Sequence, residues 1–223
     1  MLKQRTLRNS IKAVGIGLHT GQNINMELIP AEVNTGINFI RTDVDENLVI
    51  PAVAQNVGDT SLSTALVKNN VKISTIEHLM GALFGLGIDN AFIEINNKEV
   101  PILDGSAKEF IEILKSCGLE KSEVPIKIIK IQNKISYYHG EKFISIEPSK
   151  LSLDINFKLK FEDCLIGNQE NEVKTYEIGR PDLSESFGNK GEERNNIGFK
   201  AYCFGRKQFR SFRHDRIVSI TKK

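Results

Sequence analysis

Alternating polar and apolar positions predict several strands in the first half of the chain. Residues 23–28 alternate between polar and apolar side chains, as a half-buried strand does. Residues 36–41 form the next strand candidate after a turn at 34–36, and a shorter strand is expected at 49–53. The mostly apolar run at 91–95 predicts a further strand.

A helical period first becomes convincing at Ser74. The apolar side chains that follow recur at helical spacing, and they are Ile76, Leu79, Met80, Leu83 and Phe84. Gly85 and Gly87 mark the end of this helix. We therefore expect an amphipathic helix whose apolar stripe faces the core.

A second helix is predicted after Asp104 and Gly105. Ser106 is its expected N-cap, and Glu109 stands three residues later, which is the spacing of a capping box. The expected inner face consists of Phe110, Ile111 and Leu114, and Gly118 ends the helix. Strands followed by helices on short connections predict an α+β layer architecture rather than βαβ repeats.

The second half of the chain begins with a charged connection at 119–123, which we interpret as a domain boundary. Four strands are expected beyond it, with His139 and Gly140 in the first hairpin turn: 126–131, 134–138, 143–146 and 151–159. No convincing helix follows these strands. From about residue 168 the pattern deteriorates, and residues 184–200 show neither period.

Composition is that of a soluble globular protein. The chain has 223 residues, 40% of them hydrophobic and 26% charged. No apolar run is long enough to cross a bilayer, and the first residues lack the apolar core of a secretory signal, so a cytoplasmic location is expected. Three scattered cysteines, Cys117, Cys164 and Cys203, are too few for a disulfide framework and are expected to be free thiols.

The net charge of +2 hides an asymmetry between the two ends. Residues 187–223 contain ten Lys and Arg but three Asp and Glu, a net charge of +7, which leaves −5 on the rest of the chain. Phe and Arg are mixed near the end, a composition that could bind RNA. Such a run is more often a solvated or disordered end, so nucleic-acid binding is not expected.

Glu77 and His78 are the most chemically suggestive neighbours in the sequence. Ser74 and Glu77 fit a capping box, in which Ser74 caps the helix and Glu77 bonds back to the Ser74 N–H. Alternatively, Glu77 is a general base beside a metal ligand. A catalytic zinc takes three protein ligands and leaves a fourth position for water, whose proton a neighbouring Glu can accept. The residue pattern leaves both interpretations open.

The other histidines do not complete a local metal motif. They are His19, His139 and His214, and none stands four residues after His78, so the H-E-x-x-H arrangement is absent. His19 is flanked by glycines, and it either lines a pocket or belongs to an ordinary turn. No glycine-rich phosphate loop of the P-loop or Rossmann type is present.

Eight segments of the first 118 residues occur together, in the same order, in one known family. They include Gly-Ile-Gly-Leu-His-Thr-Gly at 15–21, Ile-Ser-Thr-Ile-Glu-His-Leu at 73–79 and Val-Pro-Ile-Leu-Asp-Gly-Ser at 100–106. The others lie at 4–7, 34–37, 41–43, 59–64 and 87–90, and residues 124–169 match more loosely. With these segments the chain closely resembles the zinc-dependent UDP-3-O-acyl-N-acetylglucosamine deacetylases, which commit Gram-negative bacteria to lipid A biosynthesis.

The resemblance implies both a fold and a site. The fold would be two α+β domains of related structure, each a sheet-plus-helix sandwich, facing each other across a zinc cleft. His78 would be a Zn²⁺ ligand and Glu77 the general base, while His19, Leu62, Ser63 and Asp104 would lie at the substrate cleft. Hydroxide attack on the N-acetyl carbonyl would give an oxyanion and then release acetate and the free amine.

The sequence departs from the family in its last part. The family's later H-K-x-x-D segment, which supplies two zinc ligands, cannot be placed, and the residue four after His214 is Val218, which cannot bind zinc. We therefore expect a first domain at 1–124, an incomplete second domain at 125–180 and a basic tail at 181–223 unlike the family. Our hypothesis is a change of reading frame near residues 170–190, which translation of the other two frames would test.

Three functions follow from these patterns. The first is a zinc deacetylase that acts on UDP-3-O-acyl-N-acetylglucosamine, with weak metal retention and little activity because one ligand is identifiable. The second is an inactive remnant that binds a nucleotide sugar or a partner. The third is a nucleic-acid binder that uses the basic tail. Oligomeric state is not predicted by the sequence.

Overall fold

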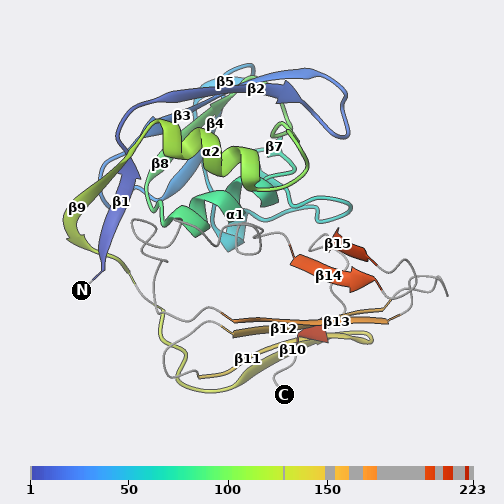
Figure 1. Ribbon diagram of the computed structural model, residues 1–223. Helices are drawn as coiled ribbons and strands as arrows, with labels where there is room; N and C mark the ends of the chain where they lie inside the picture. Colours follow the sequence, from blue (N-terminus) through green and yellow to red (C-terminus); the bar gives the residue numbers. More distant parts are fainter. Residues whose placement is uncertain are drawn as a thin grey trace. The chain divides into compact units, whose positions relative to one another are not determined.

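The computed structural model describes residues 2–127 and 129–148, together with the strands at 154–160, 168–174, 199–203, 208–212 and 219–220 (Figure 1). The chain divides into two compact units. The described part of the first unit ends at Ile126, and the second unit begins at Lys127.

A five-stranded sheet forms the centre of the first unit. Its strand order is β2-β3-β8-β4-β5, and neighbours are antiparallel except for β4 and β8, which are parallel. The strands are β2 (Ile11–Ile16), β3 (Asn23–Pro30), β4 (Ile37–Arg41), β5 (Asp45–Pro51) and β8 (Ala91–Ile95). β8 follows the other four in the sequence, yet it lies between two of them and joins the β2–β3 and β4–β5 pairs into one sheet.

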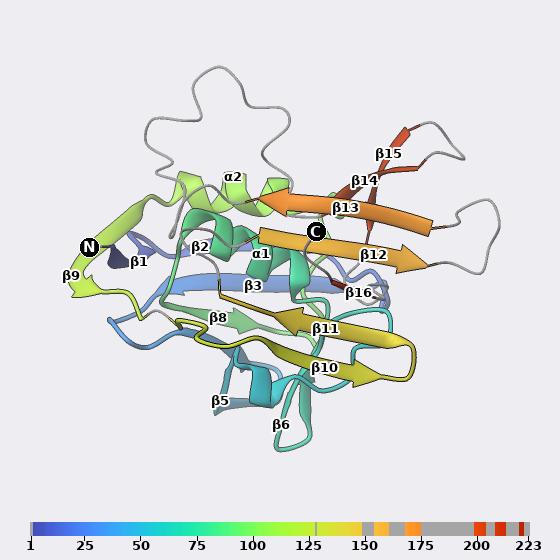
Figure 2. The same ribbon diagram turned by 90° about the horizontal axis from the view of Figure 1, so that it is seen from below.

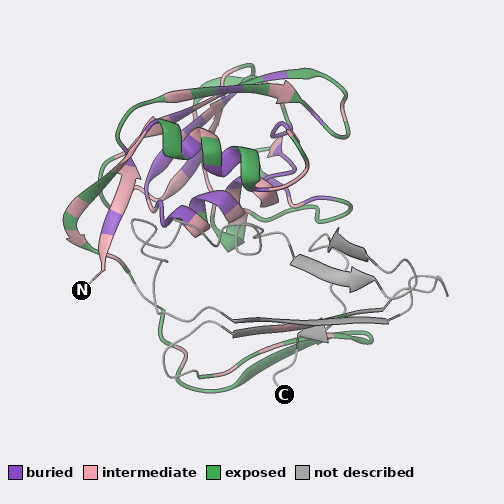
Figure 3. Cartoon of the chain, in the orientation of Figure 1, coloured by how far each residue is buried: buried purple, intermediate pink, exposed green. Residues whose placement is uncertain are grey.

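Two helices, α1 (Glu77–Leu86) and α2 (Lys108–Ser116), cover one face of this sheet (Figure 1). Figure 3 shows buried positions on the sides of the helices and strands that meet. The core side chains from these elements include Ile24, Met26, Leu28, Ile93, Ile95, Leu79, Leu83, Phe110 and Leu114. Each such side chain contributes roughly 1.5–3 kcal/mol through removal of apolar surface from water. The α+β prediction is confirmed for this unit.

Phe84 is the exception to the predicted stripe of α1. Its side chain is 66% exposed, whereas Leu83 and Leu79 are buried. Leu86 is buried instead, although the sequence pattern did not include it. The helix turns about 100° per residue, so Phe84 lies at the edge of the stripe and the side of the helix carrying Leu79, Leu83 and Leu86 faces the sheet. The prediction that Phe84 packs inward was wrong.

The first strand closes the unit by pairing with the last. β1 (Lys3–Leu7) is antiparallel to β9 (Leu119–Pro125). Residues 119–123 were expected to be a connection, and that prediction was wrong because their charged residues belong to a strand with mixed exposure. The buried Gln4 side chain donates to Asn34 Oδ1 (3.0 Å) and to the Pro125 carbonyl (2.9 Å), which fixes both strands to the loop before β4.

A short hairpin leads from the sheet to α1. After a single 3-10 turn, η1 (Ala54–Asn56), the strands β6 (Leu66–Lys68) and β7 (Val71–Ile73) pair antiparallel through Asn69 and Asn70. Both asparagines have positive φ, as two-residue hairpin turns require. This hairpin carries the chain into the segment that contains Glu77 and His78.

The second unit is described through its strands. One sheet has the order β10-β11-β16-β12-β13, and β14 pairs with β15 (Figure 2). The bounds are β10 (Ile135–His139), β11 (Lys142–Ile146), β12 (Asp154–Lys160), β13 (Asn168–Lys174), β14 (Phe199–Cys203), β15 (Gln208–Phe212) and β16 (Ser219–Ile220). Three of the four strands predicted for this half are present; the strand predicted at 126–131 is not, because its described residues are outside any strand.

The basic tail at 181–223 falls largely outside the described residues. Only the backbones of β14, β15 and β16 are described there, so nucleic-acid binding by its Phe and Arg side chains stays a prediction. His214 and Cys164 also lie outside the described residues. No helix in the described part of the chain is long and apolar enough to cross a membrane.

Candidate functional site

Glu77 is the first residue of α1, and its carboxylate faces the preceding loop. Glu77 Oε2 accepts a hydrogen bond from the backbone N–H of Thr64 at 3.0 Å. Glu77 and His78 are both half-buried, so neither is closed off from the surface. The bond to Thr64 fixes the carboxylate and ties the start of α1 to residues 59–64.

The capping box predicted from Ser74 and Glu77 is not formed. The residue before α1 is Ile76, and its side chain makes no capping hydrogen bond. The Ser74 hydroxyl and the Ser74 N–H both donate to the Lys98 carbonyl, at 3.1 and 2.9 Å, and the Val100 N–H donates to the Ser74 carbonyl at 3.0 Å. Ser74 is thus bound to the segment after β8, and its side chain is not available to cap the helix.

Thr75 stands between this bridge and α1 in an uncommon backbone conformation. Its φ is +60°, although a β-branched side chain disfavours positive φ. Such a residue costs of order 1–3 kcal/mol and persists where its surroundings hold it. Here the Thr75 hydroxyl donates to Glu99 Oε1 at 3.1 Å, and the residue is buried.

Glu99 connects this segment to the glycine-rich loop. Its carboxylate is fully buried and accepts the His19 N–H at 2.9 Å and the Thr20 N–H at 3.0 Å, besides the Thr75 hydroxyl. Burial alone would raise the pKa of Glu99, but the hydrogen bonds from these three residues lower it below its ordinary value. Glu99 is therefore an ionised buried carboxylate at neutral pH.

The loop at 59–64 contains two of the residues predicted for the substrate cleft. Asp59 accepts the Ser61 N–H at 2.8 Å and a bond from Lys72 at 3.2 Å, and these bonds, those from Ser61 first, lower the pKa of Asp59. Leu62 has a φ of +63° and is 55% exposed, while Ser63 is buried. The loop thus presents Leu62 outward.

Asp104 has a local structural role. Its carboxylate accepts the Ser106 N–H and the Ser106 hydroxyl, both at 2.9 Å, and the Ser106 hydroxyl accepts the Lys108 N–H at 3.0 Å. These bonds shape the turn into α2, which begins at Lys108, one residue later than a Ser106 cap predicts, and without the Glu109 half of the capping box. The Ile102 N–H donates to the Ile16 carbonyl at 3.0 Å, so the Asp104 turn is attached to the glycine-rich loop.

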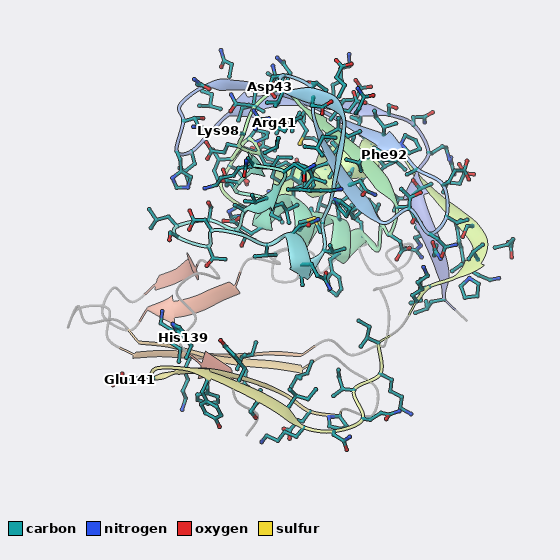
Figure 4. The ribbon with its side chains drawn as sticks, turned by 180° about the vertical axis from the view of Figure 1, so that it is seen from behind. Arg41, Asp43, Phe92, Lys98, His139 and Glu141 are labelled. Atoms are coloured by element: carbon teal, nitrogen blue, oxygen red, sulfur yellow. The ribbon has the colours of Figure 1, made fainter. Side chains whose placement is uncertain are left out.

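Arg41 braces the β6–β7 hairpin against the sheet. The buried guanidinium donates to both Asp43 oxygens, at 2.7 and 2.6 Å, and to the Lys72 carbonyl at 2.8 Å (Figure 4). These bonds hold the pKa of Asp43 below its ordinary value. The end of β4 is thereby joined to β7, which is followed by Ser74 and Thr75.

The predicted site residues of the first unit thus belong to segments joined by a short series of hydrogen bonds. Asp104 adjoins the glycine-rich loop, that loop is bound to Glu99, Glu99 is bound to Thr75, and Glu77 is bound to the loop that carries Leu62 and Ser63. His139 is not among them; it is exposed in the second unit, where it ends β10 opposite Lys142 and does not lie in the hairpin turn expected for it (Figure 4).

Glu99 and Thr75 were missed by sequence reasoning. Glu99 stands in Asn-Lys-Glu-Val-Pro, where a charged run suggests a solvated turn. The available signal was an acid placed directly before the apolar Val100 and Pro101, next to a glycine-rich loop whose N–H groups need acceptors. Its partners are far away in the sequence, so no local pattern identifies it.

The described residues do not by themselves form a catalytic zinc site. Among them, no group of three His, Cys, Asp or Glu side chains is placed to hold a metal ion. Three protein ligands are needed, and His78 is one candidate.

Comparison with known proteins covers most of the chain. Residues 4–180 match the family model of UDP-3-O-acyl N-acetylglycosamine deacetylase (LpxC). A UDP-3-O-acyl-N-acetylglucosamine deacetylase from Teredinibacter turnerae (strain ATCC 39867 / T7901) is 49% identical over 160 residues, which are 70% of this chain and 53% of that protein. The protein of the same name from Cellvibrio japonicus (strain Ueda107) is 44% identical over 162 residues, 73% of this chain and 53% of that protein. The chain thus spans about half the length of the curated relatives it matches.

Proposed function

Because the chain belongs to the UDP-3-O-acyl N-acetylglycosamine deacetylase family, we propose that it removes acetate from UDP-3-O-acyl-N-acetylglucosamine in lipid A biosynthesis. Glu77 is the general base and His78 a zinc ligand in this proposal. The observation that carries it is the Glu77 carboxylate at the start of α1, which the Thr64 N–H fixes, which is half-buried, and which directly precedes His78 in the sequence.

The chemistry of amide hydrolysis fits these residues. A general base must lie within hydrogen-bond reach of the water it deprotonates. The Thr64 N–H sets the orientation of Glu77 through one carboxylate oxygen. The same bond connects the base to the loop of Leu62 and Ser63. A substrate that contacts this loop would therefore act on a segment bonded directly to Glu77.

The substrate side of the proposal uses His19, Leu62, Ser63 and Asp104. His19 is exposed while its backbone is anchored on Glu99, so the imidazole can reach a ligand from a fixed base. Leu62 offers an exposed apolar side chain to an acyl chain, and Asp104 is an exposed carboxylate. These features support an amphiphilic substrate that has both polar and apolar parts.

The test is acetate release by the purified full chain with zinc supplied. Glu77→Gln should lower kcat by about 10²–10⁴-fold, the usual contribution of a general base. Glu109→Gln is the matched control, since Glu109 is likewise in the first turn of a helix but is exposed on α2, and it should leave kcat unchanged. Absence of acetate release by the unaltered chain would contradict the proposed activity.

Zinc retention is measured separately on the same protein. A bound zinc ion would supply Lewis acidity to the hydrolysis, and its retention through dialysis requires more ligands than His78. Near-stoichiometric zinc that is lost in His78→Ala would support the metal site. Zinc content that is equal in both proteins would contradict the role of His78.

A second candidate is binding of the nucleotide sugar without hydrolysis. It is favoured by the exposed His19 and Leu62 side chains of the first unit, together with the lack of a three-ligand metal cluster among the described residues. Calorimetric titration with UDP-3-O-acyl-N-acetylglucosamine distinguishes the two candidates. Saturable binding without acetate release would select the second.

A further inference from the structure

Glu99 is a buried anion whose recorded partners are neutral hydrogen-bond donors. Its carboxylate has no exposed surface, and in the part of the chain that the structure describes no Lys, Arg or His forms an ion pair with it. A buried charge is costly unless hydrogen bonds satisfy it. His19 and Thr20 donate backbone N–H groups and Thr75 donates its hydroxyl, at 2.9 to 3.1 Å. Such an arrangement exists only if the two donor segments are held together.

The two segments are remote in sequence and carry different parts of the proposed site. One is the glycine-rich loop, from which the His19 imidazole is exposed. The other is the residue pair Ser74 and Thr75, directly before Glu77 and His78. Glu99 Oε1 accepts both the His19 N–H and the Thr75 hydroxyl, so one oxygen atom joins them.

The local backbone leaves little room for an alternative arrangement. A Cβ added to Gly17 would lie 2.5 Å from Glu99 Oε2 and even closer to the Thr20 hydroxyl oxygen, so the loop fits around the carboxylate only with glycine there. On the other side, Thr75 keeps a φ of +60° while bonded to Glu99. The close approach of Gly17 and the disfavoured backbone conformation of Thr75 therefore both occur at the Glu99 carboxylate.

We propose that Glu99 is a positioning residue of the candidate site: its carboxylate holds the His19 loop and the Thr75 lead-in to α1 at a fixed separation, so that His19 and Glu77 act on one substrate. The proposal deepens the proposed function and rests on it for the roles of His19 and Glu77. Glu99 does not reach the reacting atoms; it acts through the two segments that it joins.

The variant Glu99→Gln tests the charge while keeping the shape. A glutamine side chain replaces one acceptor oxygen with an NH₂ group, which would face N–H donors and could not accept from them. Thr75→Val removes the donor on the other segment, and Thr75→Ser restores the hydroxyl. These three variants separate loss of the connection from loss of side-chain volume.

The first readout is amide hydrogen exchange and chemical shift in the isotopically labelled full chain. In Glu99→Gln the His19 and Thr20 amides should exchange at least about tenfold faster, the factor for one hydrogen bond to a charged group. The Glu77 and His78 amides should also shift, because the connection to Thr75 is lost. If the resonances of Glu77 and His78 stay unchanged while that of His19 shifts, Glu99 supports its own loop alone and the proposal is overturned.

The second readout is the acetate-release assay. Displacement of a positioned group by about 1 Å can cost on the order of 10²-fold in rate. We expect Glu99→Gln to lower kcat by roughly 10–100-fold and Thr75→Val by a smaller factor, with Thr75→Ser close to the unaltered chain. Equal kcat values in Thr75→Val and Thr75→Ser would contradict the role of the hydroxyl.

The two readouts keep the proposal separate from the proposed function. If the unaltered chain releases no acetate, the proposed activity fails, while the shifts of Glu77 and His78 in Glu99→Gln still decide whether Glu99 couples the segments. If Glu99→Gln does not fold, Thr75→Val and Thr75→Ser give the same comparison from the opposite side of the bond. Coupled shifts in Thr75→Val that are absent from Thr75→Ser would then support the proposal, and their absence from both would overturn it.

Discussion

β8 of the first unit and β11 of the second have similar alternating sequences but lie in different environments. In β8, Ile93 and Ile95 are buried beneath α1 and α2. In β11, Ile144 and Ile146 are 50% and 45% exposed, and the described part of the second unit contains no helix. Alternation predicts a strand and the residues that share a face, but burial of that face requires a second layer. The comparison separates strand formation from core formation.

A matched pair of isoleucine substitutions tests this difference most strongly. Ile93→Ala should lower the free energy of unfolding by about 2–5 kcal/mol, because it leaves a cavity in a packed core. Ile144→Ala should cost less than about 1 kcal/mol, since its side chain is half exposed. Urea unfolding followed by circular dichroism, with separate transitions fitted separately, measures both. Equal costs would mean that β11 is covered as closely as β8.

Carboxylates of the two units should likewise differ in how much they contribute to stability. Glu99→Gln should cost about 1–3 kcal/mol at neutral pH, because buried donors lose their acceptor. The pKa of Glu99 in the folded protein is lower than its ordinary value of 4.5, so its stabilisation is present above pH 4.5 and disappears as the pH falls through the lower folded value. The difference in Tm between Glu99→Gln and the unaltered chain should therefore shrink in acid.

Glu147→Gln is the control from the second unit. Glu147 pairs with Lys134 at 3.9 Å, and the two side chains are 35% and 61% exposed, so solvent screens the pair. Such a pair contributes at most about 1 kcal/mol, so this variant should change Tm little at any pH. A Tm loss as large as that of Glu99→Gln would remove the distinction between the two units.

Small effects are expected at the two hairpin turns. In the β6–β7 turn, Asn69 and Asn70 both have positive φ. In the β10–β11 turn, Gly140 has a φ of +59°, whereas the φ of Glu141 is not positive. Gly140→Ala should therefore cost about 1 kcal/mol, and Asn70→Gly should be neutral or stabilise by a few tenths. Thermal unfolding measures both changes. An unchanged Tm in Gly140→Ala would indicate that residue 140 does not need a positive φ in the β10–β11 turn.

Local patterns were sufficient for much of the first unit. The strands at β3, β4 and β8 and both helices could be predicted because their side chains follow the period of the element. β9 could not be predicted in this way. Its charged residues are exposed to solvent, and a charged segment of this kind resembles a connection in the sequence. Phe84 was misplaced because it lies at the edge of the stripe of α1.

The candidate site shows the same limit. Glu77 and His78 are neighbours and were recognisable, but of the two interpretations left open for the segment before them, the capping box is wrong. Ser74 bonds to Lys98, and Thr75 bonds to Glu99, so their roles depend on residues that only the folded chain brings near. Sequence spacing carries no information about such pairs unless the topology is known.

The position of β8 has a consequence for synthesis of the chain. The β2–β3 and β4–β5 pairs are local and can form early, but only β8 joins them, and β1 waits for β9 at the other end of the unit. Contacts between remote residues form slowly and leave strand edges exposed in the meantime. We therefore expect the two hairpins to stay unjoined during translation until residue 95 has left the ribosome, with strand edges open to chaperone binding up to that point.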